Sequence, residues 1–258
     1  MMTLYADLAQ QVGTDGHIAG SISTKTVDGR KYLYAVTKDG QARRQLFLGP
    51  ADDDDVQAAA ADIRRAAEQA KQLRATVTLL KNSRFPAPSL ILGRVLEVLS
   101  NAGLFDRGMT LVGTAAYQTY AGLVGSYLPA AALMTNDVDL SVSEFVAGEE
   151  EEDIQAILQR ADPSFGPIWS ANDRLPKMFR ASNSFTVDIL TRFGRGRRSP
   201  VQIESLRCAA EALSFQEYLA EETMFAVALY GRGIRVRVPL PLRYAIHKLI
   251  VAQQREPR

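Results

Sequence analysis

The stretch TNDVDLSV, residues 135–142, restricts the fold of this chain more than any other short segment. Its pattern is that of a strand, in which side chains alternate between two faces. Val138 and Leu140 would share one face, and Asp137 and Asp139 the other. A strand with such an apolar face is expected to lie in the core. Because ionised carboxylates are costly to bury without a partner, we expect the fold to bring a cation to these two aspartates.

A second segment, SFTVDILTRF at residues 184–193, repeats this pattern about 50 residues later. Val187 and Ile189 would face one way and Asp188 the other. If this strand lies beside the first, Asp188 becomes a third carboxylate at the same place. Carboxylates about 7 Å apart along one strand face can bind a shared cation, or two cations held close together. Mg²⁺ is the ion that we predict, because it favours a few carboxylate oxygens plus substrate phosphates, and Mn²⁺ is the alternative.

The segment LVGT, residues 111–114, ends a short buried strand and turns directly into a helix. A Gly-Thr turn at a helix N-terminus presents free backbone N–H groups and a hydroxyl, which suit a phosphate. The alternative is an ordinary helix start with Thr114 as the capping residue.

The charge of the chain is uneven although its net charge is only +1. Residues 174–258 hold 15 Lys and Arg against 7 Asp and Glu. This excess suggests a phosphate-bearing ligand on the C-terminal side, with scattered surface charge as the alternative. Cys208 is the only cysteine, and His17 and His247 lie far apart, so a disulfide framework or a Cys- or His-based metal cluster is not expected.

No targeting or membrane segment is expected. The N-terminal MMTLYADLAQQ lacks the basic region and apolar core of a signal peptide. The longest uncharged run, near residues 119–134, is interrupted by Gly and Pro and is shorter than a membrane span. We therefore expect a soluble, cytoplasmic protein.

The organisation along the chain begins with a three-stranded meander over residues 21–48, whose turns are marked by DGR and KDGQ. A helix over about residues 56–80 follows, and Asp52 to Asp55 complement its dipole. Helices and strands then alternate, which indicates an α/β or α+β domain. The expected segments are 89–105, 108–114, 115–128, 135–142, 148–161, 184–193, 201–223, 224–231, 234–241 and 242–255. Cys208 is expected to be buried on an amphipathic helix, and Trp169 is expected to pack in the core, with base stacking as the alternative.

The order of these motifs resembles the nucleotidyltransferase superfamily, which has the polymerase-β-like fold. A strand–GT–helix turn precedes DVDL on a strand, and a third aspartate follows on a later strand. LVGTAAYQTYAGLVG, TNDVDLSV, LPKMFRASNSFTVDILT and LRYAIHKLIVAQQR are more specifically similar to a bacterial branch of nucleotidyltransferase-fold proteins. The resemblance covers residues 88–258, and the basic meander is also similar to the segment that precedes the catalytic unit in that branch.

The resemblance implies an α+β fold, with a nucleotidyltransferase core in which helices flank a small mixed sheet. It divides the chain into an N-terminal basic β-meander (1–50), a linker helix (51–84), the catalytic core (85–200) and a C-terminal helical and β region (201–258). It also implies helices after Arg258, so either this sequence is cut short or its acceptor-binding half is small.

Site residues follow from the same resemblance. Gly113 and Thr114 would hold the triphosphate of an NTP. Asp137 and Asp139 would bind two Mg²⁺ ions, and Asp188 would complete the site and help to activate the acceptor hydroxyl. Lys248 matches a lysine near the nucleotide phosphates, with an exposed helix residue as the alternative. Lys177 and Arg180 either face the phosphates or are ordinary loop charges.

The implied activity is transfer of a nucleoside monophosphate from an NTP to a hydroxyl acceptor. RNA, including tRNA, is the favoured acceptor because basic and aromatic residues interleave in the meander and basic residues crowd a loop after the Asp188 strand. These candidates are Lys25, Arg30, Lys31, Tyr32, Tyr34, Lys38, Arg43, Arg44, Phe47, Arg192, Arg195, Arg197 and Arg198. Solvated surface charge is the alternative reading of this set.

Other acceptors and roles stay open on the sequence alone. A protein hydroxyl or a small molecule is an alternative acceptor. The competing class is a catalytically inactive module that binds nucleic acid or a partner protein. A toxin or defence component, paired with an antitoxin, is a further biological role that the same chemistry would serve.

Overall fold

The computed structural model describes residues 2–14, 20–39, 42–128, 135–148, 153–170, 174–193 and 200–254. The predicted nucleic-acid contacts Arg195, Arg197 and Arg198 lie outside these residues. None of the described helices is long and apolar enough to cross a lipid bilayer.

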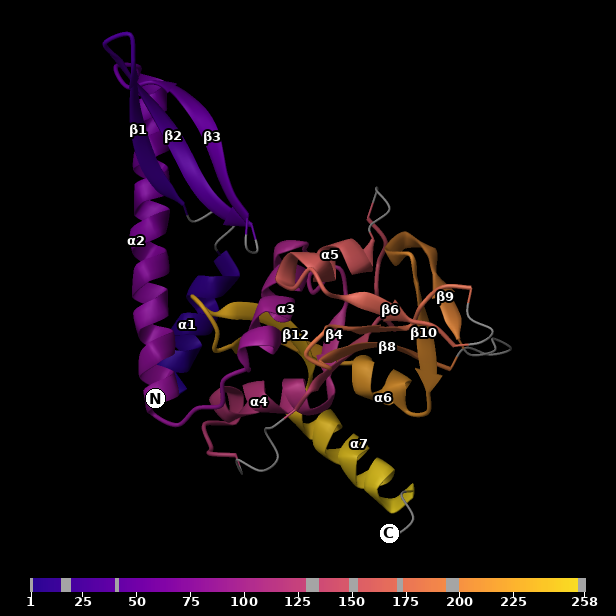
Figure 1. Ribbon diagram of the computed structural model, residues 1–258. Coiled ribbons are helices and arrows are strands. Elements are labelled where there is room, and N and C mark those ends of the chain that lie inside the picture. The colour runs from indigo at the N-terminus through magenta and orange to yellow at the C-terminus, as the bar shows by residue number, and fades with distance from the viewer. Residues whose placement is uncertain are drawn as a thin grey trace.

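The N-terminal meander is present as predicted. Strands β1 (Ser21–Val27), β2 (Arg30–Asp39) and β3 (Ala42–Pro50) form an antiparallel sheet along helix α2 (Asp54–Asn82), and together they project from the rest of the molecule as an arm (Figure 1). Asp28 and Gly29 turn the first hairpin with φ angles of 49° and 78°, the left-handed conformations that tight hairpins require. Asp53 caps α2 by accepting hydrogen bonds from the N–H groups of Asp55 and Val56.

Helix α1 (Met2–Thr14) precedes the meander and was not predicted as an element. It packs against α2, against helix α4 (Gly113–Val124) and against the two strands at residues 223–239. The Tyr5 hydroxyl donates a hydrogen bond to the carbonyl of Val227 at 3.0 Å and accepts one from the Val227 N–H at 2.8 Å. The N-terminus of the chain is thereby fixed to an element more than 200 residues away.

A mixed sheet forms the centre of the molecule. Its strand order is β4 (Thr110–Val112), β5 (Asp137–Ser141), β8 (Thr186–Arg192), β10 (Cys208–Leu213) and β9 (Val201–Ile203). β5, β8 and β10 run parallel, while β4 and β9 are antiparallel to their neighbours. β7 (Met178–Arg180) pairs with the first half of β8, and β6 (Gly166–Ile168) pairs with β7. The sheet and its helices confirm an α+β protein with a mixed sheet.

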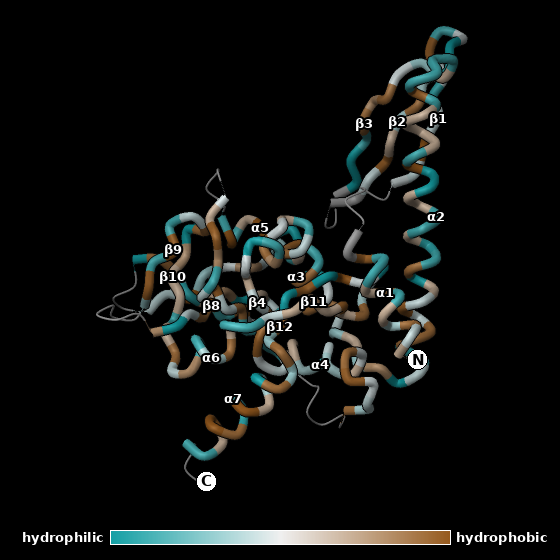
Figure 2. The backbone as a smooth tube through the Cα atoms, turned by 180° about the vertical axis from the view of Figure 1, so that it is seen from behind, coloured by the Kyte–Doolittle hydropathy of each residue, from teal (hydrophilic) through white to brown (hydrophobic). Residues whose placement is uncertain are grey.

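Helices α3 (Leu90–Asn101), α4 (Gly113–Val124) and α5 (Ile154–Ala161) surround this sheet (Figure 1). The short helix α6 (Gln216–Ala220) lies next to β8, and the 3-10 helix η2 (Glu204–Leu206) lies next to β10. A hairpin of β11 (Thr223–Ala228) and β12 (Ile234–Pro239) packs on α3, α4 and β4. Helix α7 (Pro241–Gln254) then extends away from the body, and an apolar stretch near its end precedes two terminal glutamines (Figure 2).

The main core lies where the apolar faces of β5 and β8 meet the helices. Val138, Leu140, Val187 and Ile189 are all buried there, as the alternating pattern predicts. A second cluster joins α1 to the C-terminal half of α2, and α4 and β11 contribute to it.

Two predictions were wrong. Cys208 does not lie on an amphipathic helix, because residues 201–213 form β9, a short 3-10 helix and β10. The Ala-rich segment pairs with β8 and β9 on its two sides, and this pairing prevails over local helix propensity. The thiol is buried as expected, and burial raises its pKa to about 12. Trp169 does not pack in the core but follows β6 with 58% of its surface exposed.

Candidate active site

The two aspartate-bearing strands are neighbours in the sheet. β5 and β8 pair in parallel, and their register sets Asp139 directly beside Asp188 and Asp137 beside Thr186. Neighbouring strands lie about 4.8 Å apart, so the Asp139 and Asp188 side chains leave the same face next to each other. Both are half-buried, whereas Asp137, at the start of β5, is exposed. Val138 on β5 and Val187 on β8, which alternate with these aspartates, are buried on the opposite face, as predicted.

The glycine turn lies against the same carboxylates. β4 pairs with β5 so that Val112 is opposite Asp139, and Gly113 follows with φ of 64°. A Cβ atom at position 113 would overlap the Oδ2 atom of Asp139, so a larger residue would displace that carboxylate from its position against the turn. The chain therefore brings the turn and Asp139 into direct contact.

Helix α4 begins at this turn with Val112 as its N-cap, and no side chain among the described residues caps it. The alternative in which Thr114 caps the helix is therefore wrong. Thr114 lies half-buried in the first turn of α4. Uncapped N–H groups at a helix start, together with the positive end of the helix dipole, suit an anionic group.

Helix α7 contributes a residue that the sequence did not single out. The Tyr244 hydroxyl donates a hydrogen bond to the Gly113 carbonyl at 3.0 Å. Its ring stacks on Tyr117 of α4, with ring centroids 5.9 Å apart, and meets Tyr120 edge-on at 5.0 Å. One helical turn later, the Lys248 ammonium lies 5.4 Å from the centre of the Tyr244 ring. The spacing of Tyr244 and Lys248 by four residues was the only signal of this arrangement.

The carboxylates repel one another. Burial raises the pKa of Asp188 to about 6, and the charges of Asp139 and Asp137 add to this shift. Burial also raises the pKa of Asp139, with a contribution from Asp137, while the charge of Lys248 acts in the opposite direction. Lys248 therefore lies close enough to interact with Asp139, and the cluster has an unbalanced negative charge that a cation would relieve.

The carboxylates of this cluster are loosely gathered, but their chemistry suits a divalent cation. Among the described residues, no three Asp, Glu, His or Cys side chains are gathered closely enough to form a closed metal site. The Asp137 carboxylate instead accepts a hydrogen bond from the Thr135 hydroxyl. The donor atoms that lie together at this site are nevertheless carboxylate oxygens, from neighbouring strands and on one face of the sheet. Such hard oxygen donors, in mutual repulsion, fit Mg²⁺ or Mn²⁺ in their chemistry.

The two basic residues predicted near the phosphates behave differently. The Lys177 ammonium, just before β7, forms an ion pair with the Glu211 carboxylate of β10, so its charge is offset. Arg180 is exposed at the end of β7, and the register places it opposite Thr186, on the side of the sheet where Asp188 lies. Of the two, Arg180 is the better placed to meet a phosphate.

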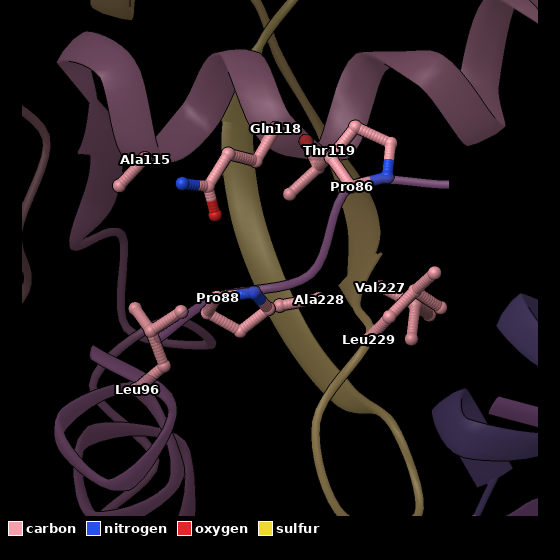
Figure 3. A pocket seen from close by; sticks show the side chains of 9 residues that line it. All are labelled: Pro86, Pro88, Leu96, Ala115, Gln118, Thr119, Val227, Ala228 and Leu229. Atoms are coloured by element: carbon pink, nitrogen blue, oxygen red, sulfur yellow. The ribbon is translucent and has the colours of Figure 1, made fainter. Parts of the chain in front are cut away.

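A small cavity lies elsewhere, between α4, residues 86–88 and the end of β11. Figure 3 shows the amide of Gln118 directed into it among mostly apolar side chains. Its lining is Pro86, Pro88, Leu96, Ala115, Gln118, Thr119, Val227, Ala228 and Leu229. None of these belongs to the carboxylate cluster, and the cavity offers no charge for a nucleotide.

Comparison with known proteins identifies the family of the chain. A protein-family model described as nucleotidyltransferase matches residues 91–258, well over half of the chain. The match contains β4, the Gly113 turn, β5, β8 and α7. No curated protein matches the chain, and no solved structure matches it. With the family model spanning every element of the site, the chain belongs to this nucleotidyltransferase family.

Proposed function

We propose that this protein transfers a nucleoside monophosphate from an NTP to a hydroxyl acceptor, with Mg²⁺ as the metal and Mn²⁺ as the alternative. One observation carries the proposal. Asp139 lies against Gly113 at an uncapped helix start and beside Asp188 on the next strand. A triphosphate on the turn would therefore meet carboxylate-held metal at its α-phosphate end.

Each part of the site has a role in this reaction. Asp137, Asp139 and Asp188 would hold the metal, which when bound neutralises charge on the phosphates and on the leaving pyrophosphate. The backbone N–H groups of Gly113 and Thr114 bind phosphate oxygens at the start of α4. Lys248 and Arg180 add positive charge beside them.

The chemical step is an in-line displacement. The acceptor oxygen forms a bond to the α-phosphorus as the bond between that phosphorus and the pyrophosphate oxygen breaks. Asp188 accepts the proton of the acceptor hydroxyl, and pyrophosphate leaves with the electron pair of the broken bond.

RNA, including tRNA, is the proposed acceptor. The support for it is the excess of Lys and Arg in the meander and in the C-terminal third of the chain. A toxin or defence role would be a setting of this same activity, and growth of cells that express the protein with and without Asp139 would test it.

The proposal is tested by calorimetric titration of each of the four NTPs, with Mg²⁺ and in EDTA. Wild-type protein is compared with Asp139→Asn and with Asp106→Asn, a carboxylate that pairs with Arg235 away from the site. Metal-dependent binding that is lost only in Asp139→Asn supports the proposal, and incubation of labelled nucleotide with total RNA then identifies the acceptor. Absence of NTP binding by folded wild-type protein would favour a catalytically inactive binding module.

A further inference from the structure

The sheet of the arm has two different faces. Leu33 and Ala35 of β2 are buried on the face that α2 covers. The opposite face, called the outer face below, follows from the strand register. Tyr34 lies between Ser23 and Phe47, Tyr32 is opposite Lys25, and Gln45 is opposite Val36. The aromatic, basic and amide side chains of the outer face that are considered below are Lys25, Tyr32, Tyr34, Arg43, Gln45 and Phe47.

The register divides the nucleic-acid contacts predicted from the sequence. Tyr32 and Arg43 belong to the outer face, whereas Lys31 and Arg44 alternate with them and belong to the face towards α2. The basic and aromatic residues of the meander are therefore not one continuous patch, and only one side of the sheet combines rings with charge.

Three aromatic rings form the middle of the outer face. The ring centroids of Tyr34 and Phe47 lie 5.3 Å apart in an edge-on arrangement, and those of Tyr32 and Phe47 lie 5.9 Å apart. Phe47 is 55% exposed. A large ring that is supported by its neighbours and still open to solvent offers its surface to another planar group.

Positive charge surrounds these rings. The Lys25 ammonium lies 4.6 Å from the centre of the Tyr34 ring and donates a hydrogen bond to the Gln45 side chain at 2.9 Å. Arg43 is exposed towards the other end of β3. Residues 20–50 contain six Lys and Arg, of which Lys31 and Arg44 belong to the other face, against two Asp at the hairpin turns. Among the described side chains of the outer face, none is a carboxylate.

We propose that the outer face binds single-stranded nucleic acid, with RNA as the strand. Rings on an open sheet stack on exposed bases, and lysine and arginine at their edges neutralise the phosphates between the bases. A duplex keeps its bases stacked within the helix and cannot present them to these rings. An apolar protein partner would use the rings but would gain nothing from the cationic surround.

This inference deepens the proposed function, on which it rests for the role of the bound strand as acceptor. The C-terminal end of β2 and the start of β3 lie at the end of the arm nearer to the catalytic unit, and the turn between β1 and β2 lies at its far tip (Figures 1 and 2). A strand along the outer face would therefore extend away from the catalytic unit. The arm would recognise RNA at a distance from the hydroxyl that reacts.

The test is fluorescence anisotropy of labelled 12-nucleotide RNA with the full chain in EDTA and without NTP, over a series of salt concentrations. Phe47→Ala should weaken binding about tenfold, because loss of one stacking platform removes most of the contact with a base. Phe47→Tyr should retain it. Arg43→Gln should reduce the slope of log Kd against log salt by about 0.7, the value for one phosphate contact on a single strand.

Leu46→Ala is the matched control, since Leu46 is the adjacent side chain, is 66% exposed and lies on the opposite face. It should leave the RNA Kd within about twofold, as should Asp139→Ala, whereas Phe47→Ala should leave NTP binding unchanged. These variants distinguish a failure of the proposed RNA site on the arm from a failure of the proposed catalytic site.

Three RNA-binding results would overturn the inference. These are no RNA binding at low salt by folded protein, equal losses in Phe47→Ala and Leu46→Ala, and duplex RNA bound as tightly as the single strand. Sedimentation of the same proteins would show whether Phe47 instead joins two copies of the chain, which would also overturn it.

Discussion

Replacement of Asp188 by asparagine should stabilise the metal-free protein. Asparagine has nearly the shape of aspartate but removes a charge that the fold holds in repulsion. The pKa of Asp188 is raised from 3.8 to about 6 by burial and by the two neighbouring aspartates. Each pKa unit corresponds to about 1.4 kcal/mol, so burial and repulsion together destabilise the charged form by at most about 3 kcal/mol. Because the side chain is only half-buried, we expect about 1 to 2 kcal/mol.

The sign of the pH dependence follows from the same shift. The folded protein binds the Asp188 proton more tightly than the unfolded chain does, so the destabilisation is complete above about pH 6. It disappears as the pH falls through about 6 towards the unfolded value of 3.8. The wild-type protein in EDTA should therefore gain stability relative to Asp188→Asn between pH 7.5 and pH 5.

Thermal unfolding in EDTA measures this difference. One kcal/mol corresponds to about 2–4 °C in Tm for a protein of this size, so the Tm of Asp188→Asn should exceed that of wild type by about 2 to 8 °C at pH 7.5. The difference should shrink at pH 5. Added Mg²⁺ should raise the Tm of wild type and leave that of the variant almost unchanged.

Asp162→Asn is the control of opposite sign. Hydrogen bonds from the Ser164 side chain and backbone N–H hold the pKa of Asp162 below its usual value, so its charge is favoured in the folded state. Its replacement should lower the Tm slightly. A metal-free Asp188→Asn protein that is less stable than wild type at both pH values would refute the view that the carboxylates repel one another.

Other contacts at the site give three further predictions. Gly113→Ala should lower the Tm in thermal unfolding and weaken NTP binding in calorimetry, because its methyl group would overlap Asp139. Gly103→Ala, with φ of 71° and no described atom within 4 Å of the new methyl, should cost only about 1 kcal/mol of backbone strain, and equal losses in the two would contradict this reading. Tyr244→Phe should lose about 1 kcal/mol of stability in denaturant unfolding, since its hydroxyl no longer holds the Gly113 carbonyl, and unchanged stability would count against that contact. Lys248→Gln should weaken NTP binding about tenfold while stability stays within about 0.5 kcal/mol, and an unchanged NTP affinity would remove the lysine from the site.

The local part of this architecture was predictable from sequence. Alternation of apolar and acidic residues placed Asp139 and Asp188 correctly on strands, because it depends only on neighbours in the chain. Their side-by-side register is a long-range pairing, which the motif order suggested and local pattern could not determine. The contact between Tyr244 and Gly113 joins residues 131 apart and had no local signal.

The secondary structure was predicted wrongly where local propensity and tertiary pairing favour different conformations. The segment around Cys208 contains good helix formers, yet two strands pair with it. Helix α1 was not predicted because its apolar residues become buried only through long-range packing against α2 and β11. The side-by-side position of Tyr34 and Phe47 on one face of the meander depends on the register between β2 and β3, which residue order alone does not determine.

Helix α2 is anchored to the body of the molecule through its C-terminal part. Its 29 residues span about 43 Å. Leu73, Val77 and Leu80 near its C-terminus are buried against α1, whereas its N-terminal half carries the sheet and extends from the body. If α2 rotated by about 5° about this C-terminal end, the far tip of the arm would move by roughly 3 to 4 Å because of the length of the helix. Packing around Leu80 therefore sets where the sheet points, so a core substitution there would act at a distance on anything the arm holds.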